Sequence, residues 1–251
     1  MHRRALALPT LLVVAAIAAG ACGGSTPALS DPSEILTKAV ESLQKAKTVH
    51  MEATVDGTLS LDLMGTGQAG DVTLSGTKLT ADVDIEDGNL EASVAVPAIL
   101  GLTADVVVVG DDTYTRTSMT GDKYQKSSTS GSGLPVDTTD PEQSLKDLQE
   151  WLKQPEVGPE KLDDSSCGGK SCYQVRIDLA ADELGALIPE AGDLGGATVV
   201  LTVLVEKDSL HPSRLTFDIT AAELGAITLT LNLSKWDESL DISAPPADEV
   251  Q

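Results

Sequence analysis

The sequence is poor in aromatic and basic residues. Its 251 residues include two Trp, three Tyr and one Phe, so a core must be built from Leu, Val, Ile and Ala. Sugar-binding clefts usually expose aromatic rings, and this scarcity argues against a glycosidase. Lys and Arg total 17 against 39 Asp and Glu, a formal net charge of −22. Such a surface repels nucleic acid and anionic membrane faces, so we predict no nucleic-acid partner and no polybasic docking to lipid.

Residues that usually carry chemistry are also few. The three histidines, His2, His50 and His211, are scattered. The sequence has no phosphate-binding loop, dinucleotide fingerprint or G-x-S-x-G elbow. Residues 82–93 begin like a calcium loop, but Gly88 falls one position late and Ser93 stands where the loop needs Glu. We therefore predict that the protein is not an enzyme and has no metal site and no cofactor.

The first thirty residues are typical of an exported lipoprotein. Arg3 and Arg4 precede an apolar stretch, Ala5 to Ala19, of about fifteen residues. Small residues then lead to Cys22, as in a bacterial lipobox. We predict a signal peptide (1–21), a tether (22–30) and palmitate-type acylation of Cys22, which would hold the protein on the extracytoplasmic face of the cell membrane. The alternative is ordinary signal cleavage, which leaves Cys22 as an exposed thiol, a liability in an oxidising compartment.

Cys167 and Cys172 enclose the turn Gly-Gly-Lys-Ser. A structural zinc site needs four ligands, and the nearest histidine is His211. Behind a signal peptide, the pair predicts a disulfide.

Helical and strand periodicities alternate along the remaining chain. Asp31-Pro32-Ser33-Glu34 predicts a helix start, followed by an apolar stripe through Val40 and Leu43. From Val49 the apolar period becomes two and recurs in short segments separated by turns, with a continuous buried run at 104–109. Further helices are expected at 140–152 and 181–191. The chain should close with a strand pair, 227–234 and 240–242, around the turn 235–238.

These elements predict an α+β fold. We expect a strongly curved antiparallel half-barrel of about eleven strands, with amphipathic helices covering a hydrophobic cavity. Residues 31–246 form a single domain and 247–251 a tail. Which strand face points inward does not follow from the sequence, because a one-residue slip in register reverses it. The expected cavity wall is Val40, Leu43, Leu59, Leu61, Val72, Leu74, Val83, Val106 and Val108.

Several segments resemble the LppX/LprAFG family of mycobacterial and related actinobacterial lipoproteins. They are the lipobox cysteine, KAKTVHMEATVDGTL (45–59), GDDTY (110–114), VLVEKDSLHPSRLTF (203–217) and LNLSKWDESLDISAPP (231–246). The resemblance implies a half-barrel like those of LolA, LolB and RseB. It also implies binding of triacylated glycolipids or related acylated lipids and their movement across the envelope, in some members beside a major-facilitator transporter. It carries over no catalytic residues.

We therefore expect a monomeric, membrane-anchored carrier of acylated lipids or glycolipids. An RseB-like sensor that reports lipid or envelope stress to a membrane partner is the first alternative. A structural surface lipoprotein without ligand is the second.

Overall fold

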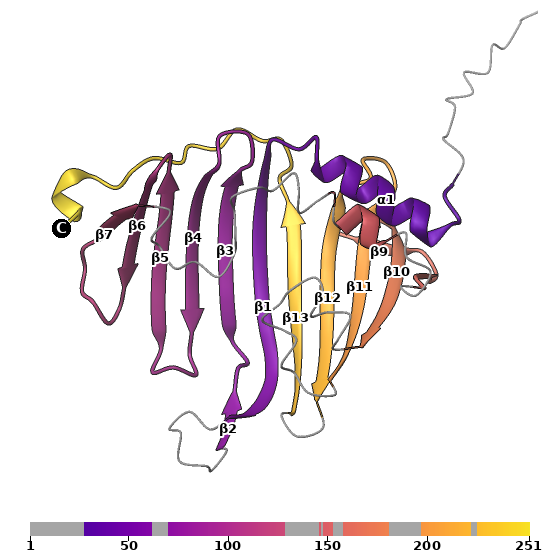
Figure 1. Ribbon diagram of the computed structural model, residues 1–251, viewed down its shortest axis with the longest axis horizontal. Helices are drawn as coiled ribbons and strands as arrows, with labels where there is room; N and C mark the ends of the chain where they lie inside the picture. The colour runs from indigo at the N-terminus through magenta and orange to yellow at the C-terminus, as the bar shows by residue number, and fades with distance from the viewer. Residues whose placement is uncertain are drawn as a thin grey trace, which may run out of the picture.

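The computed structural model describes residues 28–61, 70–128, 146, 148–152, 158–180, 197–221 and 225–251. They form one antiparallel sheet of 13 strands (Figure 1). The helices are α1 (Pro32–Leu43), a helical stretch at 148–151 and the 3-10 turn η3 (Ala247–Glu249). The strands are β1 (Thr48–Leu61), β2 (Gly70–Thr73), β3 (Thr77–Asp84), β4 (Asn89–Val96), β5 (Leu102–Val109), β6 (Asp112–Thr117), β7 (Gln125–Ser128), β8 (Glu160–Lys161), β9 (Ser165–Cys167), β10 (Lys170–Ala180), β11 (Thr198–Glu206), β12 (Pro212–Ala221) and β13 (Gly225–Ser234).

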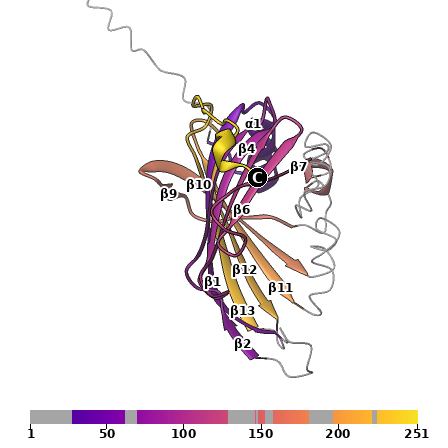
Figure 2. The ribbon, with the colours of Figure 1, turned by 90° about the vertical axis from the view of Figure 1, so that its left-hand side faces the viewer.

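The sheet consists of two runs of neighbouring strands joined in the middle. Its order is β7-β6-β5-β4-β3-β1-β13-β12-β11-β10-β8, while β2 and β9 pair with β1 and β10 off this path. The join is the long antiparallel pairing of β1 with β13. The sheet is strongly curved (Figure 2). It remains open, because its strand order ends with β7 at one edge and β8 at the other. This architecture confirms the predicted fold class.

Two glycines let β1 and β13 pass closely at the lower end of the sheet. A Cβ at Gly57 would overlap the carbonyl oxygen of Ala226, and a Cβ at Gly225 would overlap that of Thr58. Both glycines have positive φ, +121° and +105°. Here β1 leaves β3, its partner through Val55, and begins to pair with β2 at Thr58. The bend in β1 therefore depends on residues without a side chain.

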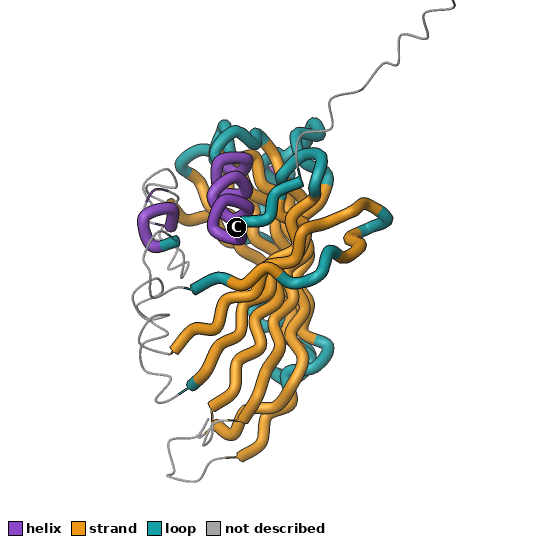
Figure 3. Tube along the Cα trace, turned by 90° about the vertical axis from the view of Figure 1, so that its right-hand side faces the viewer, coloured by secondary structure: helices purple, strands orange, loops and turns teal. Residues whose placement is uncertain are grey.

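The described core lies under α1. Asp31 caps this helix, since its Oδ1 accepts hydrogen bonds from the amides of Ser33 (2.8 Å) and Glu34 (3.3 Å). α1 and the 148–152 segment lie on the same side of the curved sheet (Figure 3). They pack on one face of β10 and β11, where the buried cluster is Ile35, Leu36, Ala39, Val40, Trp151, Leu152, Tyr173, Val175, Ile177, Leu179, Val199, Val203 and Val205.

In the predicted closing strand pair, the first strand (227–234) is confirmed by β13 and the second (240–242) is wrong. β13 ends at Ser234, and residues 239–246 form no strand. Lys235 and Asp237 have positive φ (50° and 58°), and this turn sends the chain over the opposite face of the sheet. There Ile242 and Val250 pack against a cluster of Val107, Tyr114 and Tyr124. The apolar alternation of residues 240–242 thus reflects packing of an extended tail rather than a further strand.

Some predictions fall on residues that the structure does not describe. They are the signal peptide with Cys22 and most of the tether, the start of the second helix, and the helix at 181–191. No helix within the described ranges is long and apolar enough to cross a membrane.

Candidate functional site

Strand register assigns the apolar residues of the sheet to one face. In the pairing of β1 with β3, Val49 lies opposite Val83 and Ala53 opposite Leu79. β12 and β13 follow the same rule, with Phe217 opposite Leu229. Directly paired residues share a face, and residues two apart along a strand share it too. We call this the inner face, because it is the one on which α1 packs.

The inner face is almost entirely aliphatic from β5 to β10. On β12 and β13 it presents Leu215, Phe217, Ile219, Ile227, Leu229, Leu231 and Leu233. On β1, β3, β4 and β5 it presents Val49, Met51, Ala53, Val55, Leu79, Ala81, Val83, Leu90, Ala92, Val94, Val96, Leu102, Ala104, Val106 and Val108. No Asp, Glu, Lys or Arg interrupts this set.

Burial on the inner face changes along the strands. Val49, Ala81, Val108 and Leu233, towards the end where β1 begins, are between 4% and 9% exposed. Leu79, Val94 and Leu229, towards the other end, are half-buried. Among the described residues, no inner-face side chain of β1, β3, β4, β5 or β13 belongs to a core cluster. Most of the inner-face residues listed above thus lie outside the core cluster under α1.

The register places most of the predicted wall residues on this face. Val83, Val106 and Val108 lie there directly, and Leu59 pairs with Val72 at the far end of β1. Val83, Val106 and Val108 thus form one group on the inner face, and Leu59 and Val72 form a second group at its far end.

The other four predicted wall residues lie elsewhere or at the margins. Val40 and Leu43 belong to α1. Val40 is buried in the core cluster between the helix and the sheet, and Leu43 is half-buried at the end of the helix. Leu74 follows β2, where its amide donates to the carbonyl oxygen of Gly57 (2.9 Å). Leu61 pairs with Gly70.

Sequence reasoning missed several inner-face residues. Leu79, Leu90, Val94, Leu229 and Leu231 were not among the predicted wall residues, although each has the strand phase of its neighbours. Alternation within each strand is the signal that identifies them, once the register shows which phase points inward.

Beside its buried clusters around Val107 and Leu204, the outer face carries ion pairs and other polar contacts. Arg116 donates to Asp105 through both Nε (3.1 Å) and an Nη (3.0 Å), and its guanidinium lies 4.4 Å from the centre of the Tyr124 ring. The Asp105 carboxylate raises the pKa of Arg116. His50 lies 2.7 Å from Asp82 through Nδ1. Ion pairs such as Arg116–Asp105 suit a solvated surface and contribute little to stability individually.

The Lys235–Glu238 turn holds the junction between α1 and β1. Asp237 Oδ1 accepts from the Lys47 amide (2.7 Å), and the Thr48 hydroxyl donates to the carbonyl oxygen of Glu238 (2.6 Å). Trp236 stacks on His211 with ring centroids 4.7 Å apart. Burial lowers the pKa of His211, an effect that Asp237 and Glu206 partly oppose. This motif has a structural role.

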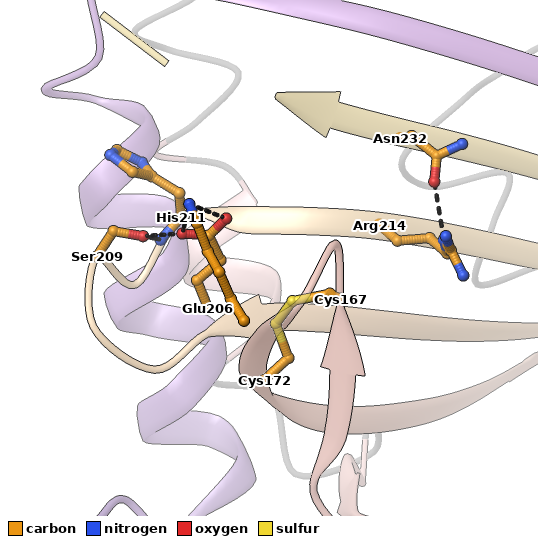
Figure 4. Close-up of a disulfide and its surroundings, with 8 residues drawn as sticks. Cys167, Cys172, Glu206, Ser209, His211, Arg214 and Asn232 are labelled. Atoms are coloured by element: carbon orange, nitrogen blue, oxygen red, sulfur yellow. Dashed lines mark hydrogen bonds and ion pairs between the residues drawn. A yellow bond between two sulfur atoms is a disulfide. The ribbon is translucent and has the colours of Figure 1, made fainter. Parts of the chain in front are cut away.

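Cys167 and Cys172 form a disulfide in the structure (Figure 4). Their Cα atoms are 6.0 Å apart, and the bond closes the turn between β9 and β10. Both cysteines are buried against Leu204 on the outer face. The bond therefore lies on the face opposite the aliphatic one.

Other candidate sites are weak. A pocket of ≈ 380 Å³ lies at the bend of β1, but Asp56 and Asp218 are among its lining residues and make it unsuited to an acyl chain. Within the described ranges, no three His, Cys, Asp or Glu side chains are grouped as they would be around a metal ion.

Comparison with known proteins points to one family. The family model described as LppX_LprAFG lipoprotein matches residues 31–242. The crystal structure of the Mycobacterium tuberculosis lipoprotein LppX is similar, with a TM-score of 0.55 at 19% identity over 85% of this chain and 100% of that one. LprF from Mycobacterium bovis gives 0.58 at 18% identity over 87% of this chain and 98% of that one. At these identities the likeness shows the fold alone. No curated protein sequence matches the chain significantly.

Proposed function

Because the chain belongs to the LppX_LprAFG lipoprotein family, we propose that it binds acylated lipids or glycolipids on its inner face and helps to transfer them across the cell envelope. The observation that supports this proposal most strongly is the aliphatic inner face. It extends beyond the described core and bears no charged side chain from β5 to β10. We further propose that acylated Cys22 anchors the protein to the extracytoplasmic face of the cell membrane.

The energetics of a carrier support this proposal. Burying one methylene group is worth about 0.8 kcal/mol relative to water, so a sixteen-carbon chain that crossed water bare would face a penalty of about 13 kcal/mol. An aliphatic protein surface removes most of this penalty, as a bilayer does. Transfer from bilayer to protein is then nearly balanced, which reversible loading and delivery require.

The shape of the face favours a ligand with more than one acyl chain. It spans many strands, and a single chain would cover a small part of it. A triacylated lipid is therefore the ligand class that we propose, with a major-facilitator transporter as candidate partner and a monomer as the acting form.

Substitutions on the two faces of the sheet provide matched tests. Val83→Trp and Val106→Trp place a bulky ring on the inner face, whereas Thr80→Trp and Ser93→Trp place the same ring on the outer face of β3 and β4. We expect the inner-face variants to bind less lipid, measured as lipid extracted per mole of folded protein. Equal lipid content in both pairs would contradict the assignment of the face.

A further inference from the structure

The turn between β4 and β5 carries an apolar tip. Four large hydrophobic side chains of the described residues are exposed, and two of them, Ile99 (52%) and Leu100 (103%), lie in this turn. A third, Met119 (78%), follows β6. The Ser118 amide donates to the carbonyl oxygen of Thr103 (2.9 Å), which places the end of β6 beside the start of β5. The two segments that carry these residues thus lie at one end of the sheet, the end where β4 turns into β5, at the bottom of Figure 1.

Leu100 occupies a position that does not suit leucine. The Leu102 amide closes a turn on the carbonyl oxygen of Ile99 (2.8 Å), and the two central residues, Leu100 and Gly101, have φ of 52° and 71°. Turns with two positive φ angles favour Asn-Gly or Asp-Gly, because a larger side chain is strained there. An aliphatic residue that is both strained and fully exposed contributes nothing to the stability of the fold. We therefore look for its role in a contact with another molecule.

The β4–β5 hairpin that carries Ile99 and Leu100 suits the apolar interior of a bilayer. Residues 92–104 contain no charged side chain, in a chain where 22% of residues are charged. A stable protein interface requires roughly 800 Å² from each partner, more than three side chains on two turns provide. Moving one such side chain from water into hydrocarbon, by contrast, changes partition by roughly ten- to a hundredfold.

The turn that carries Ile99 and Leu100 also lies directly beyond the end of the inner face. Val96 and Leu102, the last pair of the β4–β5 hairpin, lie directly next to the turn, and the rows of Val94 and Ala104 follow. This is the end at which inner-face residues are half-buried rather than buried. An acyl chain leaving a bilayer at the tip would reach aliphatic side chains without crossing a charged residue.

We propose that the tip formed by Ile99, Leu100 and Met119 inserts into the surface of a lipid bilayer and sets the end of the inner face against it. The inference goes beyond lipid binding itself, since it identifies where the protein meets the membrane. It does not depend on the anchor at Cys22.

Flotation with vesicles tests the proposal. The chain from Gly23 with Cys22 removed keeps every residue that the structure describes and lacks the proposed anchor. We expect it to float with neutral phosphatidylcholine vesicles, and to do so equally at low and high salt, because insertion of an apolar tip is not electrostatic. Vesicles containing phosphatidylglycerol should bind less at low salt, since the chain from Gly23, which lacks Arg3 and Arg4, has 15 basic and 39 acidic residues and so a net charge of −24.

The tip variant carries two substitutions, Ile99→Ser and Leu100→Asn, and the control variant carries Ile85→Ser. Ile85 (37% exposed) follows β3, at the opposite end of the sheet. The tip variant should lose binding to neutral vesicles by at least roughly tenfold, while the control keeps it. Leu100→Asn alone should also raise the melting temperature by roughly 2 °C, because Asn tolerates positive φ better. If the melting temperature of the double variant is likewise not lowered, its loss of binding cannot be ascribed to misfolding.

Three results would overturn the inference: no flotation of the parent chain, equal losses in the tip variant and the control, or a tip variant that floats normally but changes oligomeric state. Lipid content of the same samples separates this inference from the proposed function. Parent chain that carries lipid but does not float would refute the tip alone. Parent chain that floats but never carries lipid would refute the carrier function alone.

Discussion

Gly57 shows how a single residue shapes the sheet. Its φ of +121° and the closeness of the Ala226 carbonyl leave no room for a side chain. The sequence Asp-Gly within an apolar alternation resembles an ordinary turn signal, yet β1 continues through it. Only the pairing of β1 with β13 distinguishes a bend from a turn.

Replacing Gly57 with alanine should destabilise the fold by about 2–4 kcal/mol, because the methyl group forces two strands apart at a strained backbone position. Gly88→Ala is the matched control: Gly88 also has positive φ, +70°, but nothing lies within 4 Å of an added Cβ. Its cost should be about 1 kcal/mol. Urea unfolding of both variants measures the difference, and equal costs would show that the close approach is unimportant.

His211 provides a pH test at the residue scale. Its folded-state pKa is lowered by burial against Trp236, so the unfolded chain takes up a proton at a higher pH than the folded one. The stability that this site contributes is present above the unfolded pKa of about 6.5 and is lost as the pH falls below it.

We expect wild-type protein to lose more stability than His211→Phe between about pH 7.5 and pH 5.5. Phenylalanine keeps the stacked ring and cannot titrate. Asp237, Glu206 and Lys170, the charged groups that act on His211, remain in both proteins. Parallel stability–pH curves would contradict the account.

At the scale of elements, local sequence patterns predicted most strands. The arrangement of the strands and the identity of the inner face follow only from the strand register. Alternation predicted β1, β3, β4 and β13, and the cap at Asp31 predicted α1. Alternation failed for Leu240 and Ile242, since a tail packed on an apolar cluster shows the same spacing as a strand. The pairing of β1 with β13 joins residues between 166 and 184 positions apart, and no local signal specifies it. Without that pairing, the inner face could not be identified.

The cap of α1 gives a prediction for a whole element. Asp31→Ala removes the acceptor of two amide hydrogen bonds and should cost about 1 kcal/mol. Asp31→Asn keeps an acceptor oxygen and should cost clearly less. Denaturant midpoints of the two variants provide the comparison, and equal midpoints for Ala, Asn and wild type would mean that packing alone positions the helix.

At the scale of the molecule, the sheet divides into two parts with different roles. The part from β10 to β12 is packed under α1 and forms the described core, whereas the part from β13 to β5 offers an aliphatic face outside that core. A protein that needed only stability would not require so broad an apolar face. The sequence revealed its aliphatic character through the scarcity of aromatic residues, but not its direction or extent.

Native mass spectrometry of the chain from Gly23, purified without detergent from an actinobacterial host, tests the central claim most directly. Solvent extraction of the same sample identifies whatever is bound. We predict a discrete adduct that extracts as a multi-acyl lipid and disappears from Val83→Trp but not from Thr80→Trp. A clean protein mass, with no uptake after incubation with envelope lipids, would contradict the carrier function.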